Sequence, residues 1–197
     1  HDAAYVDFLK GAWARWAAEG HSCDMLPSTF PARRLRRDGP IPTALHGQLG
    51  HYCFDTEAPI TAGTWQAVYS SAQVALTAQD HMRNGANTAF ALCRPPGHHA
   101  ERAAAMGFCF FNNVAVGIRH ALDVHGLSRV ALVDFDVHHG NGSEDILAGD
   151  ERVLMCGIFE TGLYPFNGED ARRLKDAPNL VNVGLAPRSG SEAFRVA

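Results

Sequence analysis

A group of side chains that bind metal ions follows an apolar run within residues 130–142, which read Val-Ala-Leu-Val-Asp-Phe-Asp-Val-His-His-Gly-Asn-Gly. The apolar part, 130–133, predicts a buried strand that is covered on both faces. Because side chains alternate along a strand, Asp134, Asp136 and His138 can project to one side. A carboxylate and an imidazole two residues apart supply oxygen and nitrogen donors that suit a zinc-like ion. The spacing therefore predicts part of a metal site.

The stretch ends in Gly140-Asn141-Gly142, where two glycines let the backbone turn sharply. An ordinary strand end with polar loop residues is the alternative interpretation. That alternative is the better one for a lone Asp-x-His pair, but three aligned residues of ligand type favour the metal site.

Two adjacent histidines, His98 and His99, close a second motif, Arg94-Pro-Pro-Gly-His-His, which follows a strand-like run at 88–93. Two prolines end the strand and a glycine tightens the turn, so both imidazoles are held on a stiff loop. Because histidine titrates nearest to neutral pH, a fixed pair suits proton transfer. Taken alone, such a pair is more often an incidental surface feature.

A third motif is the aromatic segment Gly107-Phe-Cys-Phe-Phe-Asn-Asn113. Core packing is its simplest explanation, and we expect Phe110 and Phe111 to pack in the interior.

Together these motifs resemble the zinc-dependent deacetylase family, which includes histone deacetylases and acetylpolyamine amidohydrolases. The matching segments are 94–99, 107–113 and 133–142, in the same order and at similar separations. Tyr164-Pro165 fits the family loop that follows the next strand. Upstream, residues 49–65 are more similar to the acetylpolyamine amidohydrolase branch.

The resemblance implies a zinc-dependent amidohydrolase that removes acetyl groups from amines. By that analogy Asp136 and His138 are two protein ligands of one catalytic Zn²⁺. His99 is the general base and later the general acid, and His98 is its electrostatic partner. The ion itself could also be iron or cobalt, since a mixed oxygen and nitrogen site accepts either.

Two further residues would orient this pair of histidines, Asp134 acting on His98 and Asn141 acting on His99. Some relatives carry Asp where this chain has Asn141. A neutral amide cannot hold up the pKa of His99 as a carboxylate would, so we expect a base that is more readily neutral.

The resemblance also implies a narrow substrate tunnel with Phe108 on one wall and Tyr164 on the facing wall. The carbonyl of Gly107 would accept the substrate amide N–H. Such a shape suits an acetylated amine on a linear stem, as in acetyllysine or an acetylated polyamine. A structural K⁺ below the zinc loop, near Cys156, is a further expectation.

The family's third zinc ligand is an Asp in a Gly-Phe-Asp-Ala-like segment, and its carbonyl-polarising residue is a Tyr in a Gly-Gly-Tyr segment. Neither segment occurs in these 197 residues. The resemblance therefore implies an internal portion of a longer deacetylase, incomplete at both ends and inactive alone.

Composition fits a globular enzyme portion, and we expect a single deacetylase-like domain over residues 1–197. The net charge of −4 argues against direct nucleic-acid binding. The exception is the basic run 33–37, read as a solvated loop, with a subunit contact or an anion-binding patch as the alternative.

Five cysteines without a Cys-x-x-Cys pair fit reduced thiols, so we expect a cytoplasmic protein. The chain contains no apolar run long enough to cross a bilayer and no visible signal peptide, and we expect no membrane partner.

Helices and strands are expected to alternate. The predicted helices are 3–18, one from Thr61 to before Gly85, and 112–124; the predicted strands are 88–93, 129–135, 152–158 and 180–185. Residues 20–60 form an irregular, loop-rich insertion, which makes a homodimer plausible. This order predicts an α/β fold with a parallel sheet and helices on both faces, of the arginase/deacetylase type. Both motifs with catalytic side chains then lie at carboxyl ends of strands, where open sheets bind ligands.

Two other functions are compatible with parts of the pattern. A two-manganese ureohydrolase would need a second carboxylate where this chain has Gly140. A non-catalytic scaffold or binding protein would keep the fold without the reaction, although the four polar residues His98, His99, Asp136 and His138 argue against it.

Overall fold

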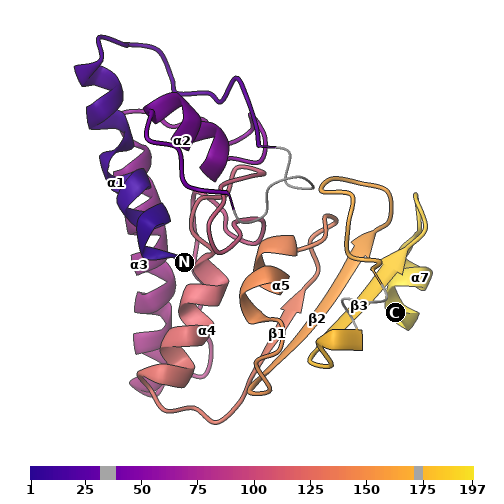
Figure 1. Ribbon diagram of the computed structural model, residues 1–197. Coiled ribbons are helices and arrows are strands. Elements are labelled where there is room, and N and C mark those ends of the chain that lie inside the picture. Colours follow the sequence, from indigo (N-terminus) through magenta and orange to yellow (C-terminus); the bar gives the residue numbers. More distant parts are fainter. Residues whose placement is uncertain (32–38, 171–174) are drawn as a thin grey trace.

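The computed structural model describes residues 1–31, 39–170 and 175–197, so the basic run 33–37 lies outside the described residues. The structure contains a parallel sheet of three strands, β1 (Val130–Asp134), β2 (Val153–Glu160) and β3 (Leu180–Leu185), in that spatial order (Figure 1). All three were predicted from the apolar runs, and the parallel α/β class is confirmed.

One face of this sheet packs against helices α4 (Asn113–Asp123) and α5 (Asn141–Leu147). The buried contact is made by Ala115, Ile118, Leu122, Leu147 and Val153. Ala115, Ile118 and Leu122 recur at helical spacing on α4, and Asn112 caps its first turn by accepting the Ala115 N–H at 3.0 Å. The helix predicted over 112–124 is therefore confirmed.

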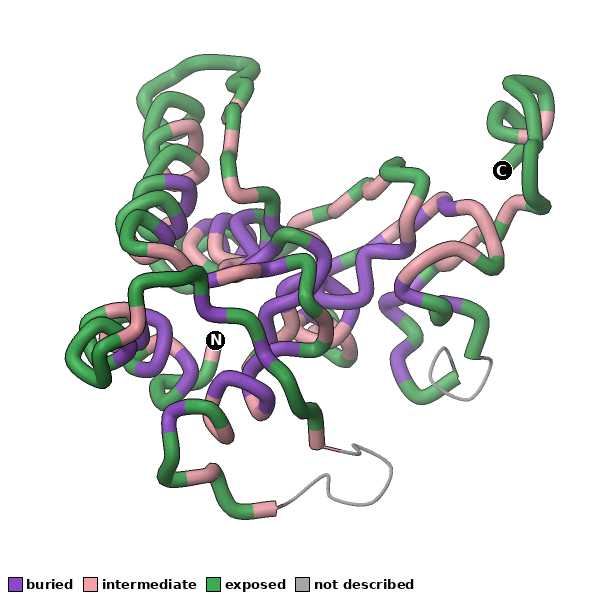
Figure 2. Tube along the Cα trace, turned by 90° about the horizontal axis from the view of Figure 1, so that it is seen from above, coloured by how far each residue is buried: buried purple, intermediate pink, exposed green. Residues whose placement is uncertain are grey.

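The opposite face of the sheet is exposed over the described residues. The register places Val133, Cys156 and Val181 in one row, and Val133 is 59% exposed and Val181 45% exposed. The expectation of a first strand covered on both faces is therefore wrong for the described residues, because only its alternate side chains face α4 and α5. The short helix α7 (Ser191–Val196) buries no residue and extends from the body (Figure 2).

A second core lies beside the sheet, where α1 (Ala3–Ala18), α2 (Leu45–Tyr52) and neighbouring loops meet. The predicted helix 3–18 is confirmed, and it buries Tyr5, Phe8, Leu9, Ala12 and Trp16. The long helix α3 (Thr64–Arg83) also ends before Gly85 as predicted. Val68 and Ala72 occupy the inward face of this helix, whereas Tyr69 is 48% exposed.

The 20–60 segment is less irregular than expected, because it contains α2. Leu45, Leu49 and Tyr52 are all buried at a spacing of four and three residues, and they pack against α1. The prolines at 40 and 42 lie before this helix and Pro59 lies after it, so they border the helix and do not prevent it.

The strand predicted at 88–93 does not form in the described part of the chain. Phe90 is 88% exposed and Leu92 is 76% exposed, and no described strand pairs with the segment. An apolar run needs a neighbour for its backbone groups before it can be a strand, and sequence pattern alone does not supply one.

All five cysteines are free thiols. Over the described residues, none of the helices combines the length and the apolar character needed to span a membrane.

We predict that Leu49→Ala destabilises the protein by about 2–5 kcal/mol, because it leaves a cavity under α2 where Leu49 is fully buried. Val74→Ala on the outer side of α3 is the control, and we expect it to change the free energy of unfolding by less than about 0.5 kcal/mol. Urea unfolding measures both; equal effects would show that α2 does not pack as described.

Candidate active site

The two histidines lie on a loop that is tied to the first turn of α5. The backbone N–H groups of Gly142 and Ser143 donate to the carbonyl of His98 at 2.9 and 3.1 Å. His99 is only 5% exposed, and the two imidazole rings lie 4.0 Å apart between centroids. The structure thus joins the His-His motif to the segment that follows β1.

His98 pairs with Asp134 at the end of β1, with 3.0 Å between Nδ1 and Oδ2. Burial by itself raises the pKa of Asp134, but the hydrogen bond and charge of His98 outweigh it, so the pKa lies below its ordinary value. A Cβ on Gly140 would lie 2.4 Å from the carboxylate oxygen, so this approach requires glycine.

His99 pairs with Asn141, the first residue of α5, with 2.8 Å between Nδ1 and Oδ1. The Asn141 amide nitrogen donates to Glu101 at 3.1 Å, which leaves the amide oxygen facing His99. An amide oxygen only accepts, so Nδ1 of His99 carries the proton and Nε2 keeps a lone pair. The pKa of His99 is lowered to about 4, chiefly by burial and then by neighbouring His98, which the Asn141 bond only partly opposes.

Asp136 and His138 lie beyond the end of β1, and the chain there follows two successive side-chain turns. Asp134 accepts the backbone N–H of Asp136 at 3.1 Å, and Asp136 accepts that of His138 at 2.8 Å. These local bonds compete with the sheet ladder and end the strand at Asp134. The three side chains are thus brought together by turns and not, as expected, by strand alternation.

The donor atoms of Asp136 and His138 fit a zinc ion. Oδ1 of Asp136 and Nδ1 of His138 lie 3.1 Å apart, and both side chains are about half exposed. Two donors each about 2.1 Å from one tetrahedral ion lie about 3.4 Å apart, close to this separation. Among the described residues no third His, Cys, Asp or Glu completes such a group.

Gly107 and Phe108 form the tip of a tight turn. Both have positive φ, 53° and 65°, and Met106 and Cys109 exchange backbone hydrogen bonds across them. This is the geometry of a type I′ turn, which holds Phe108 in a backbone region that a bulky residue rarely adopts. The Phe108 side chain is 60% exposed at this tip.

Tyr164 stands edge-on to His99, with 5.0 Å between ring centroids and 89° between planes. Its hydroxyl donates to Asp55 at 2.5 Å. Burial raises the pKa of Tyr164, and the neighbouring carboxylate of Asp55 adds to that effect. A Cβ on Gly107 would lie 2.6 Å from the His99 ring and 3.0 Å from that of Tyr164, so Gly107 is wedged between them.

Two features of this site were missed in the sequence. Asp55 is one, and the other is a buried group around His139, whose ring nitrogens lie 2.7 Å from Asn167 and 2.9 Å from Glu144. Asn182 on β3 donates to the same Glu144 oxygen at 2.8 Å. The signal that was available is Glu144 in the first turn of an otherwise buried helix, since buried carboxylates need partners.

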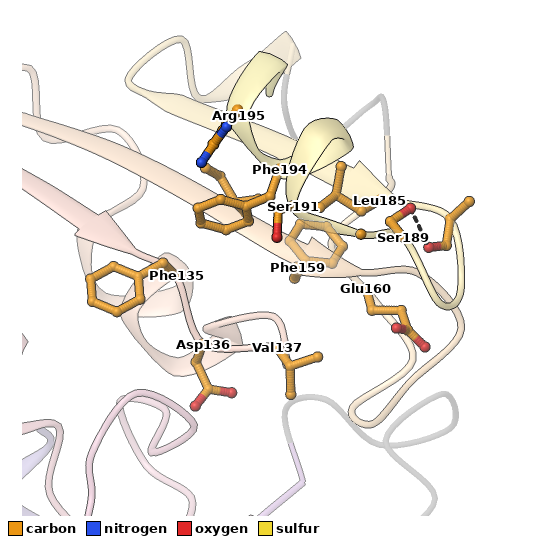
Figure 3. Close-up of a pocket in the computed structure, with 13 residues that line it drawn as sticks. Phe135, Asp136, Val137, Phe159, Glu160, Leu185, Ser189, Ser191, Phe194 and Arg195 are labelled. Atoms are coloured by element: carbon orange, nitrogen blue, oxygen red, sulfur yellow. Dashed lines mark hydrogen bonds between the residues drawn. The ribbon is translucent and has the colours of Figure 1, made fainter.

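A cavity of about 510 Å³ opens beside Asp136 on the exposed face of the sheet, under α7 (Figure 3). Its wall mixes aromatic and charged side chains, with Phe135, Phe159 and Phe194 beside Asp136, Glu160 and Arg195. Neither Phe108, Tyr164 nor the two histidines line it, so this cavity is not the predicted substrate tunnel.

Comparison with known proteins identifies the family of this chain. The family model of the histone deacetylase domain matches residues 1–197, and the chain belongs to that family.

Among curated relatives, acetylpolyamine amidohydrolase 1 of Pseudomonas aeruginosa is 67% identical over 158 residues, covering 80% of this chain and 45% of its own length. The acetylpolyamine amidohydrolase of Burkholderia pseudomallei is 37% identical over 202 residues, covering 98% of this chain and 56% of its own length. This chain thus spans about half the length of these relatives.

Solved structures give the same fold. A crystal structure of an acetylpolyamine aminohydrolase from Burkholderia pseudomallei superposes with a TM-score of 0.88 at 34% identity, over all of this chain and 57% of that one. A histone deacetylase homologue from Aquifex aeolicus, at 23% identity, has a TM-score of 0.69 over 94% of this chain and 44% of its own.

We predict that acid destabilises the metal-free protein partly through His99. Between an unfolded pKa of about 6.5 and the folded pKa of about 4, the unfolded chain binds a proton that the folded protein does not. The free energy of unfolding therefore decreases as pH falls through this window. In chelator-treated protein, His99→Gln should flatten the dependence of Tm on pH between 6.5 and 4; an unchanged slope would contradict the assigned cause.

Proposed function

We propose that this protein is a zinc-dependent amidohydrolase that removes the acetyl group from acetylated amines. The observation that carries this proposal is the meeting of two oriented histidines, His98 with Asp134 and His99 with Asn141, beside the donors Asp136 and His138. Amide hydrolysis needs a base for water, an acid for the leaving amine and a Lewis acid, and this group provides the first two.

His99 is suited to the proton transfers. Its pKa of about 4 keeps the ring neutral at neutral pH, and Asn141 fixes the proton on Nδ1, so Nε2 is free to take a proton from water. The same atom then gives that proton to the leaving nitrogen. His98, paired with the ionised Asp134, supplies a fixed charge environment beside it.

Asp136 and His138 would hold the zinc ion, together with a third ligand that the described residues do not provide. Zinc held there would supply the Lewis acid for the acetyl carbonyl and lower the pKa of a water molecule. The K⁺ expected near Cys156 stays a prediction, as does the homodimer.

An acetylated polyamine is the substrate that we favour. Its support is the names of the relatives, which are acetylpolyamine amidohydrolases, together with the Tyr164 ring beside His99 and the exposed Phe108 ring on the turn that Gly107 opens. In this proposal the Gly107 carbonyl accepts the substrate amide N–H and the rings enclose the linear stem. Acetyllysine in a protein is the alternative substrate.

One observation favours a second function, that of a non-catalytic binding protein: no third metal-binding side chain lies beside Asp136 and His138 in the described structure. A ureohydrolase has no such support. A side chain at position 140 would lie against Asp134, so a second carboxylate there would displace the Asp134 carboxylate.

We predict that Asn141→Asp raises the pKa of His99, because a carboxylate stabilises the imidazolium and an amide does not. Since the base must be neutral, the acidic limb of the pH–rate profile should move to higher pH. The profile of kcat/KM against pH for acetylputrescine measures this, and an unmoved limb would refute the assignment of His99 as base.

We further predict that His99→Ala and His138→Ala fail in different ways. His99→Ala should abolish hydrolysis of acetylputrescine and of an acetyllysine peptide while zinc stays bound, whereas His138→Ala should lose the zinc. Metal content by atomic spectroscopy and activity measured after chelation and zinc addition separate the two outcomes. Equal loss of zinc in both variants would overturn these roles, and a wild-type protein that binds no zinc and hydrolyses neither amide would favour the binding protein.

A further inference from the structure

Asp55 connects three separate parts of the chain through one carboxylate. It lies in the loop that follows α2, and its Oδ2 accepts both the hydroxyl of Tyr164 at 2.5 Å and the backbone N–H of Gly107 at 3.0 Å. Its Oδ1 accepts the backbone N–H of Glu57 at 2.9 Å, which holds the carboxylate in place through its own loop. The catalytic scheme above makes no use of Asp55.

The Gly107 N–H that Asp55 accepts belongs to the turn that presents Phe108. The positive φ of Phe108 is energetically costly for a bulky residue. Such a turn persists only where its surroundings hold it. Two backbone bonds between Met106 and Cys109 hold it from within, and Asp55 holds it from outside.

The second group on Oδ2 of Asp55 is the hydroxyl of Tyr164, the residue predicted to form the channel wall that faces Phe108. Tyr164 reaches this position from the segment after β2, and its ring stands at right angles to that of His99. The ring of Tyr164 and the turn of Phe108 are thus joined through Oδ2 of Asp55, with Gly107 wedged beside them.

We propose that Asp55 is a positioning residue that sets the distance between the Phe108 turn and the Tyr164 ring, and so selects linear amines over wider ones. This inference rests on the proposed function, because it takes these two rings as walls of the substrate channel. A rigid pair of walls excludes a wide stem by steric overlap, and walls released from Asp55 can move apart.

Asparagine cannot replace this carboxylate. If its oxygen faces Tyr164 and Gly107, its NH₂ group faces the N–H of Glu57; if it is turned over, the NH₂ group faces the N–H of Gly107. Either orientation sets a donor against a donor. Asp55→Asn is therefore nearly isosteric, but it loses either the bond from Glu57 that holds the side chain in place or the bond from Gly107, and it replaces a charged acceptor for Tyr164 by a neutral group. The substitution thus weakens the link.

The experiment compares Asp55→Asn, Tyr164→Phe and the double variant in the full protein, with Thr56→Ala as the control at an exposed neighbour. Two substrates of equal carbon number differ in width, N-acetyl-n-hexylamine and N-acetylcyclohexylamine. We expect Asp55→Asn to lower the linear-over-cyclic ratio of kcat/KM by about tenfold. The change should lie mainly in a lower KM for the cyclic amide, with zinc content unchanged. Tyr164→Phe, which removes only the hydroxyl, should lower the ratio less, and Thr56→Ala should keep it.

Thermal unfolding tests the contact between Asp55 and Tyr164 independently of any activity assay. Because both single variants weaken the same contact between Asp55 and Tyr164, the double variant should lose less Tm than the two single losses added, by about 2 °C or more. Coupled Tm losses with an unchanged ratio would make Asp55 merely structural and overturn the proposal, as would additive losses. A wild-type protein that hydrolyses neither amide would instead overturn the proposed function, and with it the role of Asp55 in the substrate channel. The coupling of the Tm losses would still report whether Asp55 and Tyr164 are joined.

Discussion

The close approach of two loops at the end of β1 is the constraint on which the rest of the site depends. The backbone at Gly142 passes so near Ala100 that a Cβ would lie 2.3 Å from its carbonyl oxygen, and Gly140 passes equally near Asp134. This proximity lets α5 donate two backbone hydrogen bonds to the His98 carbonyl. A side chain at position 142 would collide with backbone, and one at position 140 would displace the Asp134 carboxylate, so the glycines enable the chemistry without taking part in it.

The two histidines then differ because their partners and burial differ. His98 is partly buried and faces a carboxylate, whereas His99 is buried and faces an amide. A neutral partner leaves the burial of His99 uncompensated, which lowers its pKa and keeps a lone pair on Nε2. The first turn of α5 thus supplies both the N–H groups that hold the histidine loop and the Asn141 amide that fixes the proton on Nδ1 of His99.

Sequence reasoning succeeded where a local pattern also determines the local environment. The helix over 3–18 and the strands near 130, 153 and 180 follow from the periodicity of their apolar residues, and the structure has them. The run 88–93 has the same apolar character but remains without a strand partner in the described residues. The helix α2 was hidden by its flanking prolines, although Leu45, Leu49 and Tyr52 carry a helical spacing.

What the sequence by itself determined is the inventory of reactive side chains and the family, since motifs of adjacent residues are readable without coordinates. Only the tertiary structure decided which partner each side chain has. Asp55 lies 109 residues from Tyr164 along the chain and accepts a hydrogen bond from its hydroxyl. His139 likewise finds Asn167 and Asn182 on segments distant in sequence. Such pairings arise when helices and strands pack, and no local spacing encodes them, because they depend on where the backbone of another element comes to lie.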